Sequence, residues 1–355
     1  MFANGFGMKK GARATRRGIT SLIGIALLVV AVVSPVSASM AVSGVKTRTD
    51  VSQATVSGEP ADAAVADFNG DRHLDIVQAI SGGGLTVRWG VSKGVYSDPV
   101  AIDAPTVKGT RVLGVDVTAD GIADVVAWSP GGKTVWVVPA GGEHGFLATR
   151  TTMVDQGVLS VATGDFDRNG GVDLVVAAAR ANALVFLMTR DNRSGFDVVT
   201  TAVDFAPVSV ASVALDRGGY TDLVVGTRDK TLVTMMNVAG SFQRAASKSV
   251  GFEPAHLATV DLNADGHADV VAGSTLGNIA TCLWTDKGIA DPVDSGVQGA
   301  LGRMTIGYAD DDSRPDIIGS GAGVAIVYQG LEGGLFSAPR EAVRFSDVTA
   351  VAVAP

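Results

Sequence analysis

The segment "DFNGDRHLD" places oxygen-bearing side chains at Asp67, Asn69, Asp71 and Asp75. A tight loop turns side chains at alternate positions toward one point, as in the first half of an EF-hand calcium loop. Two carboxylates about 5 Å apart repel each other by roughly 3 kcal/mol at an effective dielectric near 20, and a divalent cation reverses that repulsion. Hard oxygen ligands favour Ca²⁺ over Zn²⁺. The segment therefore predicts a calcium site, although Asn, Asp and Gly also suit a plain hairpin turn.

The same nine-residue pattern recurs five more times along the chain. The six segments begin at residues 67, 116, 165, 214, 261 and 308, so their spacings are 49, 49, 49, 47 and 47 residues. The later copies read "DVTADGIAD", "DFDRNGGVD", "ALDRGGYTD", "DLNADGHAD" and "YADDDSRPD". A period this regular indicates internal structural repeats.

Short β-strands must position these segments. An apolar strand such as "VLGVD" leads into each segment, and a β-rich run such as "DLVVAAA" follows its last Asp. A turn, a third apolar strand and a more polar fourth strand complete the unit, and no helical periodicity appears after residue 40. Four short antiparallel strands in 47–49 residues form the unit of a β-propeller blade. The sequence thus predicts an all-β propeller whose third strands supply core residues between blades: Trp89, Trp136, Phe186, Met235 and Trp284.

The two ends of the chain raise the question of how the ring closes. "TAVAVAP" (349–355) matches a first strand, and "VKTRTDVSQATV" (45–56) resembles a fourth strand. We therefore expect six full repeats plus a partial seventh blade formed by the two termini. Six blades with a stray strand, or a truncated chain, are the alternatives. The predicted division is a signal peptide (1–40), a linker with an N-terminal closing strand (41–60) and the propeller (61–355).

The first 40 residues have the pattern of a secretory signal peptide. Five basic residues precede an apolar run of 12 residues, Leu22 to Val33, and "SPVSASMA" supplies small residues for cleavage after Ala38 or Ala41. The run is short for a membrane span, and an uncleaved anchor is the alternative. "TRRGIT" leaves the twin-arginine export route open. We therefore expect a secreted protein, extracellular or at the cell surface, without membrane insertion after cleavage.

Removing this segment makes the chain strongly acidic. Of 28 basic residues five leave with the signal, so the remaining charge is 23 − 36 = −13. Such a charge argues against nucleic acid or an anionic membrane surface as a partner. Cys282 is the only cysteine, which excludes an internal disulfide. A secreted protein without disulfides needs another stabilising element, and bound cations would provide it.

The repeated loops resemble those of FG-GAP/VCBS repeats, the family whose β-propellers include the headpiece of integrin α subunits. The resemblance extends from about residue 45 to the end, and the lack of literal Phe-Gly and Gly-Ala-Pro signatures places it nearer the bacterial VCBS branch. It implies that each loop joins the first two strands of a blade and binds Ca²⁺, at three to four sites in this chain. The implied ligands are Asp67, Asn69, Asp71 and Asp75; Asp116, Thr118, Asp120 and Asp124; Asp165, Asp167, Asn169 and Asp173; and Asp261, Asn263, Asp265 and Asp269.

Two repeats depart from the family pattern. Ala214 and Gly218 replace ligands in the fourth repeat, and Tyr308 replaces the first ligand in the sixth. The sixth keeps Asp310, Asp312 and Asp316. We expect these degenerate loops to act as plain turns that preserve the shape of the blade.

No motif identifies a catalytic centre. The chain has no Gly-x-Ser-x-Gly elbow and no phosphate-binding loop with a lysine, and its four His residues are scattered. We therefore predict that the protein is not an enzyme but an adhesion or recognition module for an extracellular protein or glycan. A carbohydrate-active enzyme (polysaccharide lyase or hydrolase) on a propeller scaffold and a purely structural module are the alternatives. The sequence leaves the partner and the oligomeric state open.

Overall fold

The computed structural model describes residues 29–33, 52–55, 60–92, 95–216, 218–295, 301–308, 312–321, 323–338 and 340–353. Within these ranges the chain is all-β, apart from one 3-10 turn at Gly142–His144. No helix in the described part of the chain is long and apolar enough to cross a membrane.

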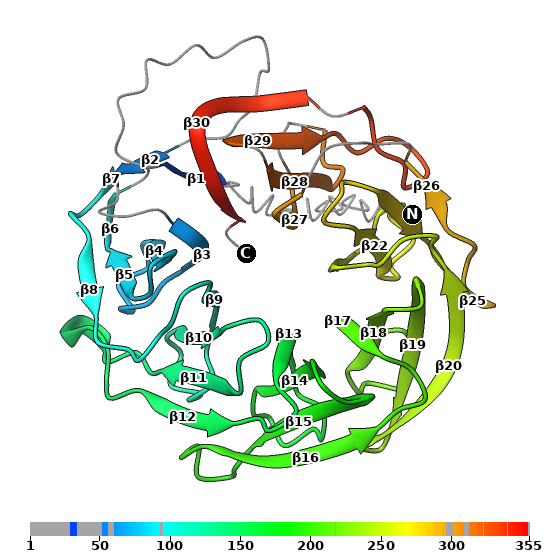
Figure 1. Cartoon of the computed structure of the whole chain (residues 1–355), viewed down its shortest axis with the longest axis horizontal. Helices are drawn as coiled ribbons and strands as arrows, with labels where there is room; N and C mark the ends of the chain where they lie inside the picture. The colour runs from blue at the N-terminus through cyan, green and yellow to red at the C-terminus, as the bar shows by residue number, and fades with distance from the viewer. Residues whose placement is uncertain are drawn as a thin grey trace, which may run out of the picture.

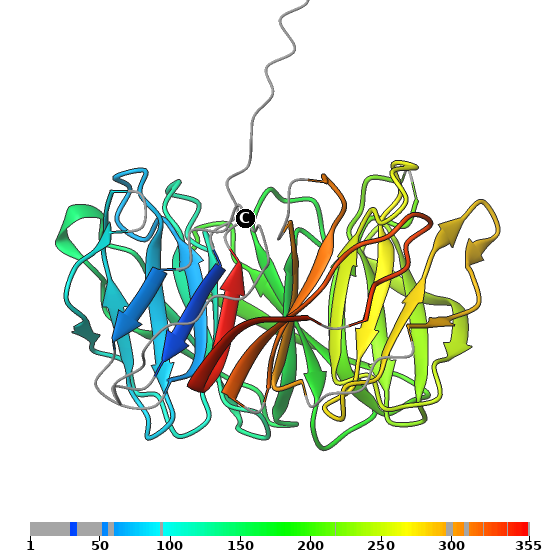
Figure 2. The same ribbon diagram turned by 90° about the horizontal axis from the view of Figure 1, so that it is seen from above.

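Six four-stranded antiparallel blades surround a common axis and form a β-propeller (Figure 1). The first strand of each blade lies nearest the axis and the fourth lies toward the outer rim, except that the last part of β30 (Arg340–Val353) turns in toward the axis (Figure 1). The side view shows a shallow ring (Figure 2). The prediction of six full repeats in an all-β propeller is confirmed. The blades comprise β3 (Pro60–Ala66), β4 (Asp75–Ile80), β5 (Leu85–Arg88) and β8 (Val100–Ile102); β9 (Arg111–Val115), β10 (Asp124–Trp128), β11 (Thr134–Val138) and β12 (Arg150–Met153); β13 (Val158–Gly164), β14 (Asp173–Ala178), β15 (Ala183–Thr189) and β16 (Phe196–Ala202); β17 (Pro207–Val213), β18 (Asp222–Thr227), β19 (Thr231–Val238) and β20 (Ser241–Ser249); β21 (His256–Val260), β22 (Asp269–Gly273), β23 (Ile279–Cys282) and β26 (Val293–Asp294); and β27 (Arg303–Gly307), β28 (Asp316–Gly321), β29 (Gly323–Tyr328) and β30 (Arg340–Val353).

Two short hairpins stand beside these blades. They pair β6 (Gly90–Ser92) with β7 (Val95–Tyr96), and β24 (Trp284–Thr285) with β25 (Gly288–Ile289). Each extends the turn between the third and fourth strands of its blade, in the first and fifth repeats.

The sheet of the sixth blade continues into three strand segments from the two ends of the chain. The last part of β30 pairs with β1 (Val29–Val33), and β1 pairs in parallel with β2 (Ser52–Thr55). The two expected terminal segments thus join one sheet, but β1 lies between them, and a partial seventh blade is not confirmed. Apart from β1, the predicted signal peptide (1–40) lies outside the described residues.

Adjacent blades bury the faces of each other's central strands. Every residue of β10 and of β14 is buried, because neighbouring blades cover both faces. This explains why "DVVAW" and "DLVVAA" are apolar without alternation, as in sheets covered on both faces. In the outer strand β20, by contrast, every residue is exposed or partly exposed.

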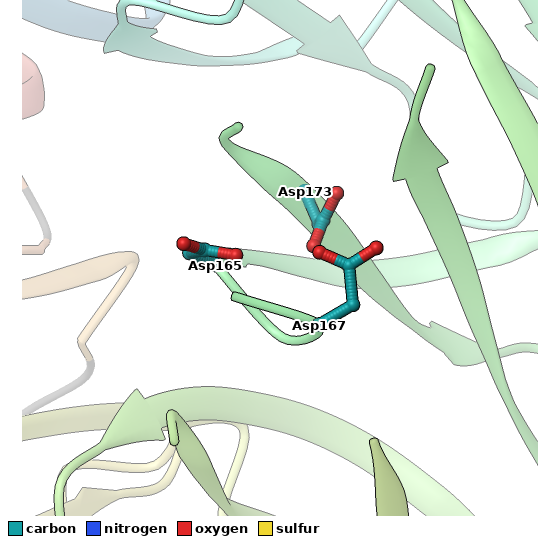
Figure 3. Close-up of side chains that lie close together, drawn as sticks. All are labelled: Asp165, Asp167 and Asp173. Atoms are coloured by element: carbon teal, nitrogen blue, oxygen red, sulfur yellow. The ribbon is translucent and has the colours of Figure 1, made fainter. Parts of the chain in front are cut away.

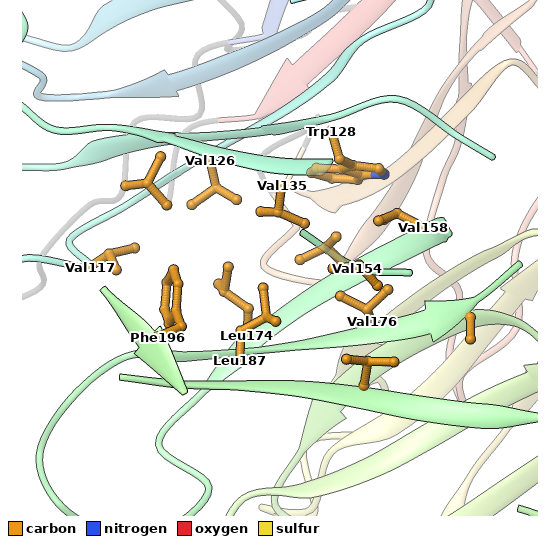
Figure 4. Packing of buried hydrophobic residues seen from close by; sticks show 14 of the residues in the cluster. Val117, Val126, Trp128, Val135, Val154, Val158, Leu174, Val176, Leu187 and Phe196 are labelled. Carbon is orange, nitrogen blue, oxygen red and sulfur yellow. The ribbon is translucent and has the colours of Figure 1, made fainter. Parts of the chain in front are cut away.

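Among the described residues, five hydrophobic clusters lie between successive blades. The cluster between the second and third blades combines Val126 and Trp128 of β10 with Leu174 and Val176 of β14 (Figure 4). Of the residues predicted as third-strand core, Trp136, Phe186 and Met235 are buried in the clusters between other blades. Trp89 and Trp284 lie just after their third strands and pack against these clusters while partly buried.

Candidate metal centres

The nine-residue loops join the first and second strands of each blade, as the family resemblance implied. Position 1 directly follows the innermost strand, and position 9 is the first residue of the second strand. Position 2 is an apolar side chain that is buried between blades: Phe68, Val117, Phe166, Leu215 and Leu262. The loop is therefore fixed on the core by position 2, while positions 1, 3 and 5 remain at the surface or near it.

The carboxylate at position 1 holds the loop in its turned conformation by accepting backbone hydrogen bonds. Asp67 accepts hydrogen bonds from the backbone N–H groups of Gly70 and Arg72, at 2.7 and 2.8 Å. The first carboxylates of loops two, three and five likewise accept N–H groups from positions 5 and 6, at 2.8–3.2 Å: Asp116, Asp165 and Asp261. In the fourth loop Ala214 offers no such acceptor.

The backbone at positions 4 and 6 adopts the left-handed region, which lets the loop turn inward. Gly121, Gly170 and Gly266 occupy position 6 with φ of 87°, 75° and 85°. Glycine adopts this region without steric cost, which explains the "DG" and "NG" pairs in the sequence. In the first loop Arg72 takes the same conformation with φ 69°.

Positions 3 and 5 lie next to each other at the open side of the loop. The Asn69 side-chain N–H donates to Asp71 at 3.1 Å, and Asn263 donates to Asp265 at 2.9 Å. In the third loop Asn169 donates to Asp167 at 3.1 Å. These pairs bring two oxygen-bearing groups together in each of the three loops.

The third loop brings three carboxylates together. One oxygen each from Asp165, Asp167 and Asp173 lies within 4.8 Å of the others (Figure 3). In the part of the chain that the structure describes, no other three acidic, His or Cys side chains gather this closely. Burial raises the pKa of Asp173, backbone donors oppose the shift, and the charges of Asp167 and Asp165 raise it further. This concentration of negative charge is what a divalent cation relieves.

The first and fifth loops show the same repulsion between neighbouring carboxylates. Burial raises the pKa of Asp75 to about 6, and the charges of Asp71 and Asp67 add to the rise against two backbone hydrogen bonds. Burial likewise raises the pKa of Asp269, with further contributions from Asp265 and Asp261. Both loops therefore hold three carboxylates close enough to influence one another, and an asparagine oxygen completes each set.

The second loop holds a weaker set. The Thr118 hydroxyl lies 3.5 Å from Asp124, and the Thr118 backbone N–H also donates to that carboxylate. Burial raises the pKa of Asp124, and hydrogen bonds from Ala140, Thr118 and Val117 oppose the shift. Asp116 and Asp120 supply the other two carboxylates of this loop.

In the two degenerate loops, the remaining acids contact groups of their own loop. In the fourth loop Asp216 accepts the N–H of Gly218 at 2.6 Å. In the sixth loop Asp312 forms an ion pair with the guanidinium of Arg314, which supplies a positive charge from the protein itself. Asp310 lies outside the described residues.

The acid at position 9 has a second role that the sequence reasoning missed. It is fully buried in all six repeats, and its two oxygens accept N–H groups at 2.7–2.9 Å from position 2 of its own loop and from a residue at the end of the third strand or just after it. For Asp316 the described donor is Gly330. The signal was present in the sequence, because Asp222 and Asp316 persist where other ligands are lost.

Cys282 is buried in β23, and burial raises the pKa of its thiol to about 12. A thiol that stays protonated at neutral pH is a poor nucleophile. The prediction of a small core residue at this position agrees with its packing between the fourth and fifth blades.

Comparisons with known proteins agree with this architecture. An FG-GAP-like repeat family model matches residues 116–176, which span the second and third loops and the strands between them. No curated protein sequence matches the chain. Among solved structures, a lectin from Agrocybe aegerita, described as recognising non-reducing terminal N-acetylglucosamine, is 19% identical with a TM-score of 0.57, and 80% of each chain is covered.

Two further solved structures share the fold. A protein from Lactobacillus plantarum is 14% identical with a TM-score of 0.56, and a Bacteroides uniformis protein whose name proposes a 6-phosphogluconolactonase is 14% identical with a TM-score of 0.57. In both comparisons 83% of this chain and 88% of the other is covered. At these identities the likeness shows the fold alone. The chain folds as a six-bladed β-propeller. Six loops at a nearly even period, four of which begin and end with Asp, and the FG-GAP-like match over residues 116–176 support an FG-GAP repeat propeller.

Proposed function

We propose that this protein is a secreted calcium-binding β-propeller that serves as a recognition module for an extracellular protein or glycan. The observation that carries the calcium proposal is the convergence of Asp165, Asp167 and Asp173 within 4.8 Å. Backbone N–H groups and the Asn169 amide donate to these carboxylates, but none of these donors carries a full positive charge to balance the three acids. Calcium at such a site neutralises the carboxylates and fixes the loop between two strands.

The donor set of the loops fits Ca²⁺. All side-chain candidates at positions 1, 3, 5 and 9 are carboxylate, amide or hydroxyl oxygens, and these are the ligands that calcium prefers. The first, third and fifth loops carry complete sets, and the second has Thr118 in place of an acid or amide. We therefore assign three strong sites and one weaker site.

The recognition proposal is supported by the fold and by the lack of an assembled catalytic set in the described residues. The lectin neighbour, which is similar in fold and is described as recognising N-acetylglucosamine, supports a recognition role without defining the ligand. The pattern of residues 1–40 supports secretion.

Binding of immobilised glycans and extracellular proteins, compared in CaCl₂ and in EDTA, tests this function. A specific, saturable ligand retained in CaCl₂ supports it. Turnover of a polysaccharide substrate by the purified protein would instead identify a carbohydrate-active enzyme, and no binding to any glycan or protein would favour a purely structural module.

A further inference from the structure

A groove between the second and third blades brings three arginines together. It lies where β12 meets the turn that joins β15 to β16, and it encloses about 360 Å³. Arg150 begins β12, while Arg190 and Arg193 belong to the turn. Acidic residues outnumber basic ones by 36 to 28 in the whole chain, yet no acidic residue lines this groove in the described structure. The groove is therefore a local positive site on an acidic protein.

Backbone hydrogen bonds hold the turn that carries two of these arginines. The N–H of Arg190 donates to the carbonyl of Gly195 at 3.0 Å, and the N–H of Arg193 donates to the carbonyl of Arg190 at 2.8 Å. Arg150 Nη1 donates to the carbonyl of Arg193 at 2.6 Å, which ties β12 to the turn across the blade boundary. The groove is thus built from two blades and is shaped before any ligand enters.

The described hydrogen bonds of these arginine side chains use few of their available donors. A guanidinium has five N–H groups in a planar fork. Arg150 uses one of them on a backbone carbonyl, and Arg190 uses Nε on the exposed Asp197 at 2.7 Å, a surface pair of little strength. Arg193 Nη1 is buried, lacks a hydrogen-bond partner among the described residues, and lies against Gly171 of the third metal loop. The groove and that metal loop therefore share a wall.

The rest of the lining combines apolar surface with hydroxyl groups. Val117, Val137 and Phe196 belong to the core cluster beneath, with Val117 and Phe196 at one end of it (Figure 4). Met153 and Val198 at the rim are 56% and 48% exposed. Hydroxyls come from Thr151, Thr152 and Ser194. Ligand sites commonly pair apolar walls with a few polar groups in this way.

We propose that this groove binds the carboxylate of an acidic saccharide, with Arg150 and Arg190 as its anion-binding residues. A guanidinium fork matches a carboxylate in two parallel hydrogen bonds. The apolar lining accommodates the carbon face of a sugar ring, and the hydroxyls suit its oxygen atoms. A lone inorganic anion would leave most of the 360 Å³ unfilled. The inference rests on the proposed recognition function and names a ligand class for it.

Calorimetric titration in CaCl₂ tests the groove with four probes: glucuronate, a galacturonate tetrasaccharide, glucose and sodium sulfate. We expect at least one uronate probe to bind, glucose to give no signal, and excess sulfate to compete only weakly. Arg190→Gln, at an exposed side chain, and the double variant Arg150→Gln/Arg190→Gln should weaken uronate binding, the latter at least tenfold. Arg228→Gln removes the same charge from an exposed position on the fourth blade and should bind as the parent does.

Three results would overturn the assignment. The first is that no uronate binds, or that glucose binds as well as the uronates do. The second is that sulfate fully displaces the uronate. The third is that the double variant binds with the affinity of the parent while its melting temperature is unchanged. If the protein binds another glycan or a protein and the double variant binds it equally well, the groove assignment fails while the recognition function stands. If the parent protein binds none of the wider ligand panel, the recognition function fails as well.

Discussion

The buried carboxylate of Asp75 accepts the backbone N–H of Gly90 at 2.7 Å, so the start of the second strand is tied to the chain just after the third strand. Its other oxygen accepts the N–H of Phe68 at 2.8 Å, which ties it to its own loop. The equivalent acid makes the same link to the third strand in every repeat. The residue at position 9 therefore holds the blade together, whether or not its loop can bind a metal ion.

This anchoring role predicts a cost in the fourth repeat, where the metal ligands are missing. Asp222→Asn replaces one accepting oxygen by a donor that faces the N–H of Leu215 or of Asn237. We expect the free energy of unfolding to fall by about 1–3 kcal/mol. Urea denaturation should give the same loss in CaCl₂ and in EDTA.

Asp216→Asn in the same loop is the matched control, because Asp216 is exposed and accepts a single local N–H within the loop. It should change the free energy of unfolding by less than about 0.5 kcal/mol, as surface substitutions usually do. Equal losses in the two variants would contradict an anchoring role for position 9.

The third loop predicts the loss of a single ion from one substitution. Asp167→Asn removes a charge from the three-carboxylate cluster while leaving the buried anchor Asp173 in place. Calorimetric titration of chelator-stripped protein should give three to four calcium ions per chain in the parent and one fewer in the variant. An unchanged stoichiometry with unchanged affinities would exclude this cluster as a binding site.

The ion pair between Arg303 and Asp62 joins the sixth blade to the first across 241 residues of sequence. Asp62 is fully buried and also accepts the N–H of Val112 at 3.0 Å. Arg303→Met should destabilise the fold by about 3–5 kcal/mol, because it leaves a buried charge without its closest partner. Adding Asp62→Asn should restore most of the loss in urea denaturation, and a double variant no more stable than the single one would contradict this explanation.

His256 predicts a defined sensitivity to acid. Burial lowers its pKa to about 4, the hydrogen bond to the carbonyl of Leu301 opposes the shift, and Arg111 and Arg303 lower the pKa further. Because the pKa is lower in the folded state than the ordinary value of about 6.5, the stabilising contribution is complete above pH 6.5 and is lost as the pH falls toward 4. The loss reaches at most about 3 kcal/mol.

The difference between the parent and His256→Gln isolates this effect from other titrating groups. The stability of the parent should fall relative to that of the variant between pH 6.5 and 4, as measured by urea denaturation at each pH. A difference that does not vary with pH would show that His256 is not buried in its neutral form.

Much of the blade architecture could be predicted from the sequence, because the loop pattern recurs at an even period and each strand is short and apolar. The loops were placed correctly between first and second strands by the positions of Asp67 and Asp75. Ring closure could not be predicted, because pairing among β1, β2 and β30 depends on segments far apart in sequence that carry no loop motif. The second role of Asp173, as the acceptor of a hydrogen bond from the third strand, could not be predicted either. Its donor, the N–H of Thr189, lies 16 residues away.

The central claim is that calcium in the loops stabilises the propeller, and thermal melting with and without chelator tests it most directly. A ligand at 100 times its Kd adds about 2.7 kcal/mol per site, which corresponds to a rise of several degrees in Tm for a domain of this size. We predict that EDTA lowers the Tm of the parent, that Asp71→Ala and Asp265→Ala each reduce this difference, and that Asp216→Ala preserves it. An identical Tm in CaCl₂ and in EDTA would contradict the account.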